Sequence, residues 1–254
     1  MNTILRIAGI TIKELLHEKI FYFLGAFSLL AVALSLVLGG LTYAEQSKIT
    51  VDFLLAGIEL TSLLFSVFMG ITLLHRELNL GWIAMVLSKP VSRTHFLLGK
   101  FLGQGTIQAF VILFLGGLTI GMCRENEISL VYSALFQSLL LTFFQGILMS
   151  SIVYFFAVNL GALVSAGASI GLFALGSFTE GAAKTNPALD QSPVWKIITA
   201  LLPNFRLFNV KTLVSYGLTT DWNLIGIVTL YTGVCTSLFL VLAGICFSKR
   251  DIYT

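Results

Sequence analysis

The residues of this chain that could do chemistry are few, and their spacing matches none of the common catalytic motifs. A phosphate-binding loop needs G-x-x-x-x-G-K-[ST]; here Gly99-Lys100 is followed by a phenylalanine, and no glycine stands five residues before Gly99. His17-Glu18-Lys19 lacks the second histidine of the zinc-protease pattern H-E-x-x-H. The chain therefore carries no recognisable ATPase loop and no zinc-hydrolase motif.

Metal sites and disulfides are not expected either. His75 and His95 stand 20 positions apart and have no cysteine near them. Cys123, Cys235 and Cys246 are widely separated, which does not suggest a disulfide framework. No Ser/His/Asp set is recognisable, so an enzyme is the least favoured class.

Two carboxylates within one apolar run are the first candidates for function. Asp52 and Glu59 are seven residues apart, which places them on one face of a helix, about 10 Å apart along its axis. A carboxylate inside hydrocarbon is costly, so Glu59 should face protein or water. It is interpreted either as part of a polar translocation path, which Gln104 and Gln108 would also line, or as a structural hydrogen-bond partner. The possible partners on neighbouring apolar runs are Gln104, Gln108, Gln137 and Gln145.

A basic, amphipathic stretch, 75–100, is the second candidate. Its apolar residues alternate with charged ones, and Pro90 should end a first short helix because proline lacks the amide donor. Ser92 could cap a second helix that begins at Arg93. The stretch is either a docking surface or an ordinary loop whose positive charge only sets topology. The candidate docking residues are Glu77, Gly81, Lys89, Pro90 and Arg93.

The elements that position these residues are predicted to be membrane helices. Charged residues make up 11% of the chain and hydrophobic ones 57%, whereas soluble proteins average about 25% charged. About 20 apolar residues span a bilayer as a helix, and the uncharged stretch 128–178 suits two helices with a turn at Asn159-Leu160-Gly161. The fold class is therefore an all-α polytopic membrane protein. The six expected spans are about 20–41, 53–74, 101–122, 130–157, 161–178 and 222–247.

The first span could instead be a signal peptide, but its apolar run exceeds the usual 7–15 residues or so. Residues 1–19 have apolar positions at three-to-four spacing, which favours a helix lying in the membrane interface over a frayed tail. Residues 179–221 form an outer segment, whose apolar part is expected to lie back on the membrane. Gly117–Gly121 and Gly167–Gly171 are GxxxG pairs, which mark close helix contacts in a bundle or a dimer.

The distribution of lysine and arginine predicts the orientation. With six spans, nine of these residues fall on the side of residues 1–19, 75–100 and 248–254, and two fall in the short loops of the other side. Positive charge beside a span resists translocation. Both termini are therefore expected in the cytoplasm, in a multi-pass protein of the cell membrane.

The pattern E-L-x-x-G-x-x-x-x-x-L-S-K-P-V-S-R-x-x-F-L-L-G-K-F-L-G, from Glu77 to Gly103, resembles type-2 ABC-transporter permeases. It is most similar to the branch associated with multicopper-enzyme maturation. The stretch Leu202–Asn209, with its Pro-Asn-Phe, resembles the family segment before the last span. The resemblance implies an N-terminal elbow helix, a cytoplasmic coupling helix within 75–100, and a separate P-loop ATPase subunit that docks there. It also implies a second permease copy and no cofactor in this chain, because the partner binds the ATP.

The sequence leaves two functional hypotheses besides an enzyme. One is the permease subunit of an ABC transporter, most simply an exporter. The other is a secondary carrier that uses Glu59 as its coupling carboxylate, although carriers usually show internal repeats and none is visible here. The substrate is not predicted by either hypothesis, and neither is the choice between homodimer and heterodimer.

Overall fold

The computed structural model describes residues 2–40, 46–79, 93–125, 128, 130–185 and 202–249. Among these residues all regular structure is helical. This confirms the all-α fold class. The elements are α1 (Asn2–His17), α2 (Lys19–Gly40), α3 (Gln46–Asn79), α5 (Arg93–Glu125), α6 (Tyr132–Asn159), α7 (Ala162–Thr185), η1 (Phe205–Phe208), α10 (Lys211–Ser215) and α11 (Trp222–Lys249).

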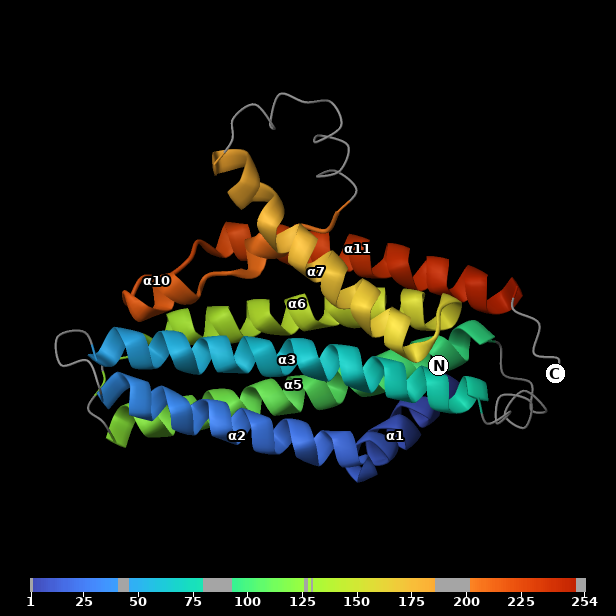
Figure 1. Cartoon of the computed structure of the whole chain (residues 1–254), viewed down its shortest axis with the longest axis horizontal. Coiled ribbons are helices and arrows are strands. Elements are labelled where there is room, and N and C mark those ends of the chain that lie inside the picture. The colour runs from blue at the N-terminus through green and yellow to red at the C-terminus, as the bar shows by residue number, and fades with distance from the viewer. Residues whose placement is uncertain are drawn as a thin grey trace.

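The long helices run side by side in one bundle, with α3 near its centre (Figure 1). Helix α3 packs on α2, α5 and α6, and α11 covers the other side of α6. Tyr154, Phe65 and Met69 are among the largest fully buried side chains. A helix satisfies its own backbone hydrogen bonds, which is why apolar segments of this length are stable as helices in lipid.

The number of membrane spans is resolved in part. Within the described residues, α3, α5, α6 and α11 are long and apolar enough to cross a bilayer. Helices α1 and α2 meet at a bend of 65° and qualify together as one further, broken span. The described apolar part of α7, Ala162–Phe178, is shorter. The structure thus supports four or five spans, and the count of six stays a prediction, as does the placement of α1 in the interface.

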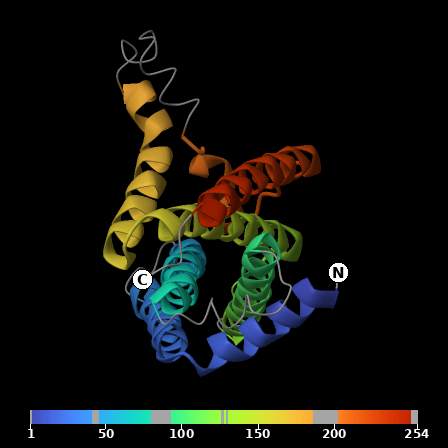
Figure 2. The ribbon, with the colours of Figure 1, turned by 90° about the vertical axis from the view of Figure 1, so that its right-hand side faces the viewer.

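The turn expected at Asn159-Leu160-Gly161 is present. Helix α6 ends at Asn159, Leu160 is extended (φ −121°, ψ 165°), and α7 begins at Ala162. The Leu160 backbone N–H caps α6 by donating to the Phe156 carbonyl at 2.8 Å. From this turn α7 leans across α6, and its far part stands away from the other long helices (Figures 1 and 2).

The bundle has two distinguishable ends. At one end, seen face-on in Figure 2, lie α1, the last turn of α3, the first turn of α5 and the last turn of α11. We call it the basic end, because Arg76, Arg93 and Lys100 lie there. At the opposite end, the far end, α10 lies beside the start of α3 (Figure 1).

The described part of the outer segment packs against the bundle, with η1 near the middle and α10 toward the far end. Phe205 and Phe208 of η1 are buried, and η1 lies against α6 and α7. The Asn204 backbone N–H donates to the Tyr231 hydroxyl at 2.8 Å, and the Asn204 side chain caps η1 by accepting from the Arg206 N–H. The Pro-Asn-Phe motif therefore anchors the chain just before α10.

Glycine contacts occur where the sequence did not predict them. A Cβ at Gly103 would lie 2.7 Å from the Thr11 Cβ and 2.9 Å from the Ala8 carbonyl oxygen, so α5 crosses α1 at nearly backbone-to-backbone distance. Gly99 meets Ile7 in the same way. At the predicted packing glycines Gly117, Gly121, Gly167 and Gly171, no described atom lies within 4 Å of the position that a Cβ would occupy. If those pairs make helix contacts, the contacts are to something outside the described chain.

Candidate functional site

Three polar groups in the described residues interrupt the apolar bundle: one at the basic end, one in its middle, and one just beyond the middle toward the far end. The basic-end cluster consists of Glu14, Glu18, Arg76 and Lys100. The mid-bundle network consists of Ser62, Ser66, Gln104, Gln108 and Ser150. The outer pair is Glu59 and Lys211, with Gln145 as a third member.

The bend between α1 and α2 positions the acids of the basic-end cluster. Glu14 lies in the last turn of α1, and Glu18 is the single residue between the two helices, with its backbone N–H donating to the Leu15 carbonyl at 3.2 Å. Helix α1 is held against α5 by Gly99 and Gly103, whose missing side chains allow the close approach. Leu15 of α1 is fully buried. It packs against α3 and α5, which keeps this face of α1 turned toward the bundle.

Lys100 is the buried member of this cluster. Its side chain is 3% exposed, and its ammonium group donates to Glu14 Oε2 at 2.6 Å. The ammonium also lies 5.7 Å from the centre of the Phe96 ring, within cation–π range. A buried charge is costly unless it is paired, so Glu14 is what makes Lys100 tolerable at this position.

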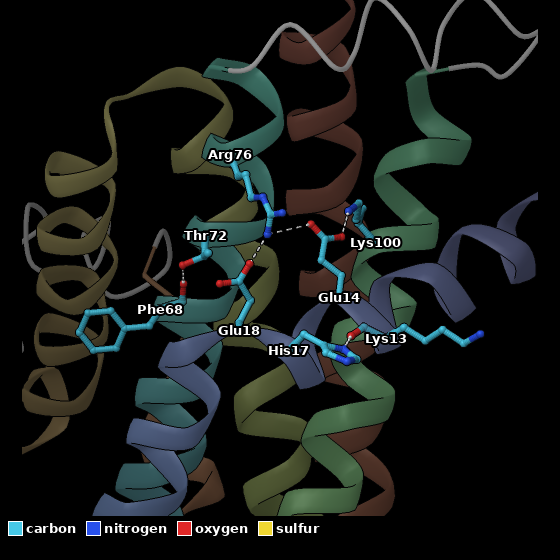
Figure 3. Close-up of polar contacts among 8 residues, drawn as sticks. All are labelled: Lys13, Glu14, His17, Glu18, Phe68, Thr72, Arg76 and Lys100. Carbon is cyan, nitrogen blue, oxygen red and sulfur yellow. Dashed lines mark hydrogen bonds and ion pairs between the residues drawn. The ribbon is translucent and has the colours of Figure 1, made fainter.

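Arg76 completes the cluster from α3. It forms an ion pair and hydrogen bond with Glu18 and a second ion pair with Glu14 at 3.8 Å (Figure 3). Two acids from the α1–α2 bend thus face two bases, one near the end of α3 and one near the start of α5. The cluster is neutral overall, and it joins the two helices that flank residues 80–92 to the same short helix.

The predicted docking residues fall mostly outside the described part of the structure. Gly81, Lys89 and Pro90 lie outside the described residues, and Glu77 lies in α3 with its side chain outside them. Arg93 is described as the first residue of α5. Its Nη1 donates to the carbonyl oxygens of Phe247 and Ser248 at 2.9 and 3.1 Å, which satisfies carbonyls at the end of α11.

The mid-bundle network encloses the two glutamines that were predicted to line a path. Gln108 donates to the hydroxyls of Ser62 and Ser66 at 2.9 and 3.0 Å. Gln104 donates to the Ser66 carbonyl and to the Ser150 hydroxyl. Both glutamines are essentially unexposed, so in this structure they lie within a single chain. Their assignment to a translocation path stays a prediction.

The outer pair gives Glu59 its partners. Lys211 of α10 forms an ion pair with Glu59 Oε2, and Gln145 of α6 donates to Glu59 Oε1 at 2.9 Å. Of the four glutamines considered from the sequence, Gln145 is therefore the one bonded to Glu59. Burial lowers the pKa of Lys211 below its ordinary value, while the negative charge of Asp52 acts in the opposite direction.

Gln137 holds the outer segment at a second point. Its amide exchanges two hydrogen bonds with the Thr220 backbone: it donates to the carbonyl at 3.0 Å and accepts from the N–H at 2.9 Å. The stretch between α10 and α11 is thereby tied to α6 close to where α11 begins. The outer segment is thus fastened to α3 and α6 through polar contacts.

Sequence reasoning missed the basic-end cluster and Lys211. The spacing of Glu14 and Glu18 was visible, but the sequence offered no sign that they face Arg76 and Lys100. Among the described residues no group of three histidine, cysteine or acidic side chains is placed to hold a metal ion, and the three cysteines are free thiols. The ion pairs of the basic-end cluster link the end of α1, the end of α3 and the start of α5 to one another. The contribution of this cluster is therefore mechanical coupling of helix ends.

Comparison with known families gives one match. A family model described as "ABC-2 family transporter protein" matches residues 19–252. No individual curated protein matches the chain. The matched range covers every described helix except α1.

Proposed function

From its membership of the ABC-2 transporter family, which the match over residues 19–252 establishes, we propose that this chain is a permease subunit driven by a separate cytoplasmic ATPase docking on residues 75–100. The chain is a multi-pass membrane protein of a transporter family. The proposed direction is export, and the proposed assembly is two permease copies with two ATPase subunits. Both termini and the basic end would face the cytoplasm, as the bias of lysine and arginine favours. The multicopper-maturation branch is not supported by the match, and the substrate is not proposed.

The observation that carries this proposal is the position of the basic-end cluster. Arg76, near the end of α3, and Lys100, within the first two turns of α5, lie at the two ends of the proposed docking segment. Both bases are paired to Glu14 and Glu18. A displacement of residues 77–92 by a partner would therefore act on α3, α5 and α1 together instead of bending one helix end.

A coupled movement of this kind is what an ATP-driven permease needs from its membrane subunit. ATP binding would bring the ATPase subunits together, and the docking segment would move with them. The outer pair and the Gln137–Thr220 contacts would keep the outer segment closed over the far end until α3 and α6 shift. The ATP chemistry would belong to the partner, since this sequence has no phosphate-binding loop. No observation favours the carrier alternative, because Glu59 is already paired with Lys211.

The proposal is tested by charge reversal with a matched control. Glu77→Arg changes the last turn of α3 within the proposed docking segment, and Glu125→Arg makes the same change at the last residue of α5, at the far end. The tagged full chain is purified in mild detergent from its native cells, and co-purifying proteins are identified by mass spectrometry. Glu77→Arg should lose a P-loop ATPase that the wild type and Glu125→Arg retain. Equal recovery from both variants would count against docking at 75–100, and recovery of no ATPase with the wild type would count against the whole assignment.

A further inference from the structure

An apolar groove runs between the start of α5 and the end of α11, outside the three polar groups described above. Its volume is about 490 Å³, within the range of about 300–1,000 Å³ typical of small-ligand pockets. Leu97 and Leu98 form the α5 wall; Leu240, Val241 and Ile245 form the α11 wall. Val241 is 61% exposed and Ile245 48% exposed, so the groove opens on the outer surface of the bundle.

The floor of the groove lies where the two helices approach each other. A Cβ at Gly244 would contact the Thr94 Cγ2 at 3.5 Å, an ordinary van der Waals distance. Figure 2 shows the start of α5 and the end of α11 at the same end of the bundle. The groove is therefore open because residue 244 has no side chain, and a larger residue would project into it.

The length of the groove fits one leaflet of a bilayer. Its α11 wall extends from Ser237 to Ser248, which at the helical rise is about 17 Å. Half of the hydrocarbon thickness of a bilayer is about 15 Å. The groove thus matches the depth of a single acyl chain in the leaflet at the basic end.

Positive charge lies at the rim of the groove at the basic end. Arg93 donates to the carbonyls of Phe247 and Ser248 and lies 5.9 Å from the centre of the Phe247 ring. Ser248 and Thr94 line the groove beside it. His95 is exposed one residue further along α5. An apolar channel that ends at a basic rim complements an acyl chain with an anionic headgroup.

We propose that this groove binds one anionic phospholipid, with an acyl chain between α5 and α11 and its phosphate at Arg93. The charged rim favours this occupant over an apolar face of a second copy, which would have to bury the Arg93 charge. The inference rests on the chain being a membrane protein and not on the proposed ATPase partner. Since α5 and α11 meet beside the proposed docking segment, a lipid here would hold the two helices at a fixed separation.

The test measures lipid binding by native mass spectrometry. The full chain, with any subunits that co-purify, is stripped of lipid in mild detergent and titrated with dioleoyl phosphatidylglycerol or dioleoyl phosphatidylcholine. The wild type should bind one phosphatidylglycerol. Gly244→Leu, which fills the floor, should weaken that binding at least tenfold. Gly233→Leu, the same change on α11 at a glycine with open space around it, should leave the binding unchanged.

The headgroup is tested separately with Arg93→Gln. One basic residue near a membrane surface contributes about 1 kcal/mol to anionic-lipid binding, equivalent to about fivefold in affinity. The variant should therefore lose about a fivefold preference for phosphatidylglycerol over phosphatidylcholine. Leu98→Trp fills the groove from the α5 wall. If Gly244→Leu does not fold, the loss of phosphatidylglycerol binding is measured in Leu98→Trp instead.

Two results would overturn the proposal. The first is phosphatidylglycerol binding that is equally tight in Gly244→Leu or Leu98→Trp and in Gly233→Leu. The second is a loss of dimer mass in the filled variants with lipid binding intact, which would make the groove an interface between copies of the chain. Loss of the ATPase in the Glu77→Arg experiment has no bearing on either result.

Discussion

Lys100, buried in α5, donates a hydrogen bond at 2.6 Å to Glu14 of α1, a residue 86 positions earlier in the chain. The two partners differ in exposure: the Lys100 side chain is 3% exposed and the Glu14 side chain 18%. Glu14 also has a second base, Arg76, at 3.8 Å. Mutation of Glu14 and mutation of Lys100 should therefore change the stability of the chain by different amounts.

The first prediction concerns this asymmetry. Glu14→Gln removes the carboxylate that accepts from the almost unexposed Lys100 ammonium at 2.6 Å, and should cost about 3 kcal/mol of stability, the lower range for breaking a buried pair. Lys100→Met leaves Glu14 partly exposed and still near Arg76, so it should cost less. The double variant should recover most of the loss. Thermal unfolding of the purified chain in detergent measures all three, and a larger loss for Lys100→Met would contradict the assignment of Lys100 as the dependent partner.

The second prediction concerns the α1–α5 crossing. Gly103→Leu places a side chain where Thr11 and the Ala8 carbonyl already lie, so α1 should detach from α5 and the chain should lose stability by about 2 kcal/mol or more. Gly117→Leu, in the same helix, meets no described atom and should leave the stability of a single chain unchanged.

The Gly117 variant also tests the predicted packing role of the Gly117–Gly121 pair. If that pair lies at a contact between two copies, Gly117→Leu should shift the native mass toward the monomer while monomer stability is kept. An unchanged dimer would remove Gly117 from the contact. Hydrogen exchange across residues 2–17 distinguishes loss of α1 packing from loss of dimerisation.

The third prediction concerns the mid-bundle network. Gly146 lies against the Gln108 amide so closely that a Cβ at 146 would collide with it, and the Gly146 carbonyl accepts from Ser66 at 3.0 Å. Gly146→Ala should therefore destabilise the bundle by about 1–3 kcal/mol, and Gln108→Ala in the same chain should relieve part of that loss by removing the obstructing amide. A double-mutant cycle by thermal unfolding measures the coupling; strictly additive losses would show that the two residues do not collide.

The fourth prediction concerns the outer pair. Lys211→Met removes the ion pair between α10 and α3, so hydrogen exchange over residues 202–221 should rise while the rest of the bundle is unaffected. Glu59→Gln should have a second effect. Burial already lowers the pKa of Lys211; loss of the neighbouring carboxylate removes a charge that favours the ammonium form, so that pKa should fall further.

The pH dependence of hydrogen exchange over residues 202–221 tests whether the pKa of Lys211 falls in Glu59→Gln. In Glu59→Gln the transition caused by Lys211 deprotonation should occur at a lower pH than in the wild type. Glu125→Gln, at the last residue of α5, serves as the control for removing a negative charge at the same end of the bundle. A transition at the same pH as in the wild type, or at a higher pH, would show that Glu59 does not raise the pKa of Lys211.

The long helices and the turn between α6 and α7 could be predicted from the sequence, because they follow from the lengths of the apolar runs and from the residues that interrupt them. Uninterrupted apolar runs form helices in lipid whatever their neighbours are, and the chain could only turn where Asn159-Leu160-Gly161 break the run. Polar pairings across helices could not be predicted in the same way. Glu59 had four glutamines of similar chemistry as possible partners, and only the packing of α3 against α6 selects Gln145.

The basic-end cluster was missed for a related reason. Whether Glu14 faces Lys100 depends on the rotation of α1 over α5, and that rotation is set by Gly99 and Gly103. The GxxxG spacing of these two glycines was present in the sequence, but so were Gly117–Gly121 and Gly167–Gly171. Spacing alone does not show which of three similar pairs has a helix lying across it.

The contrast between α6 and α11 bears on how the chain enters the membrane during synthesis. The central window of α6 is 67% buried and that of α11 only 22%. Gln145 and Ser150 make α6 expensive to expose to lipid alone, but their partners Glu59 on α3 and Gln104 on α5 have already been made when α6 leaves the ribosome. Helix α11 needs no such companions until it docks on α6. The order of the helices along the chain is thus also a workable order of assembly for the middle of α6, whose glutamine and serine arrive after the helices that receive them.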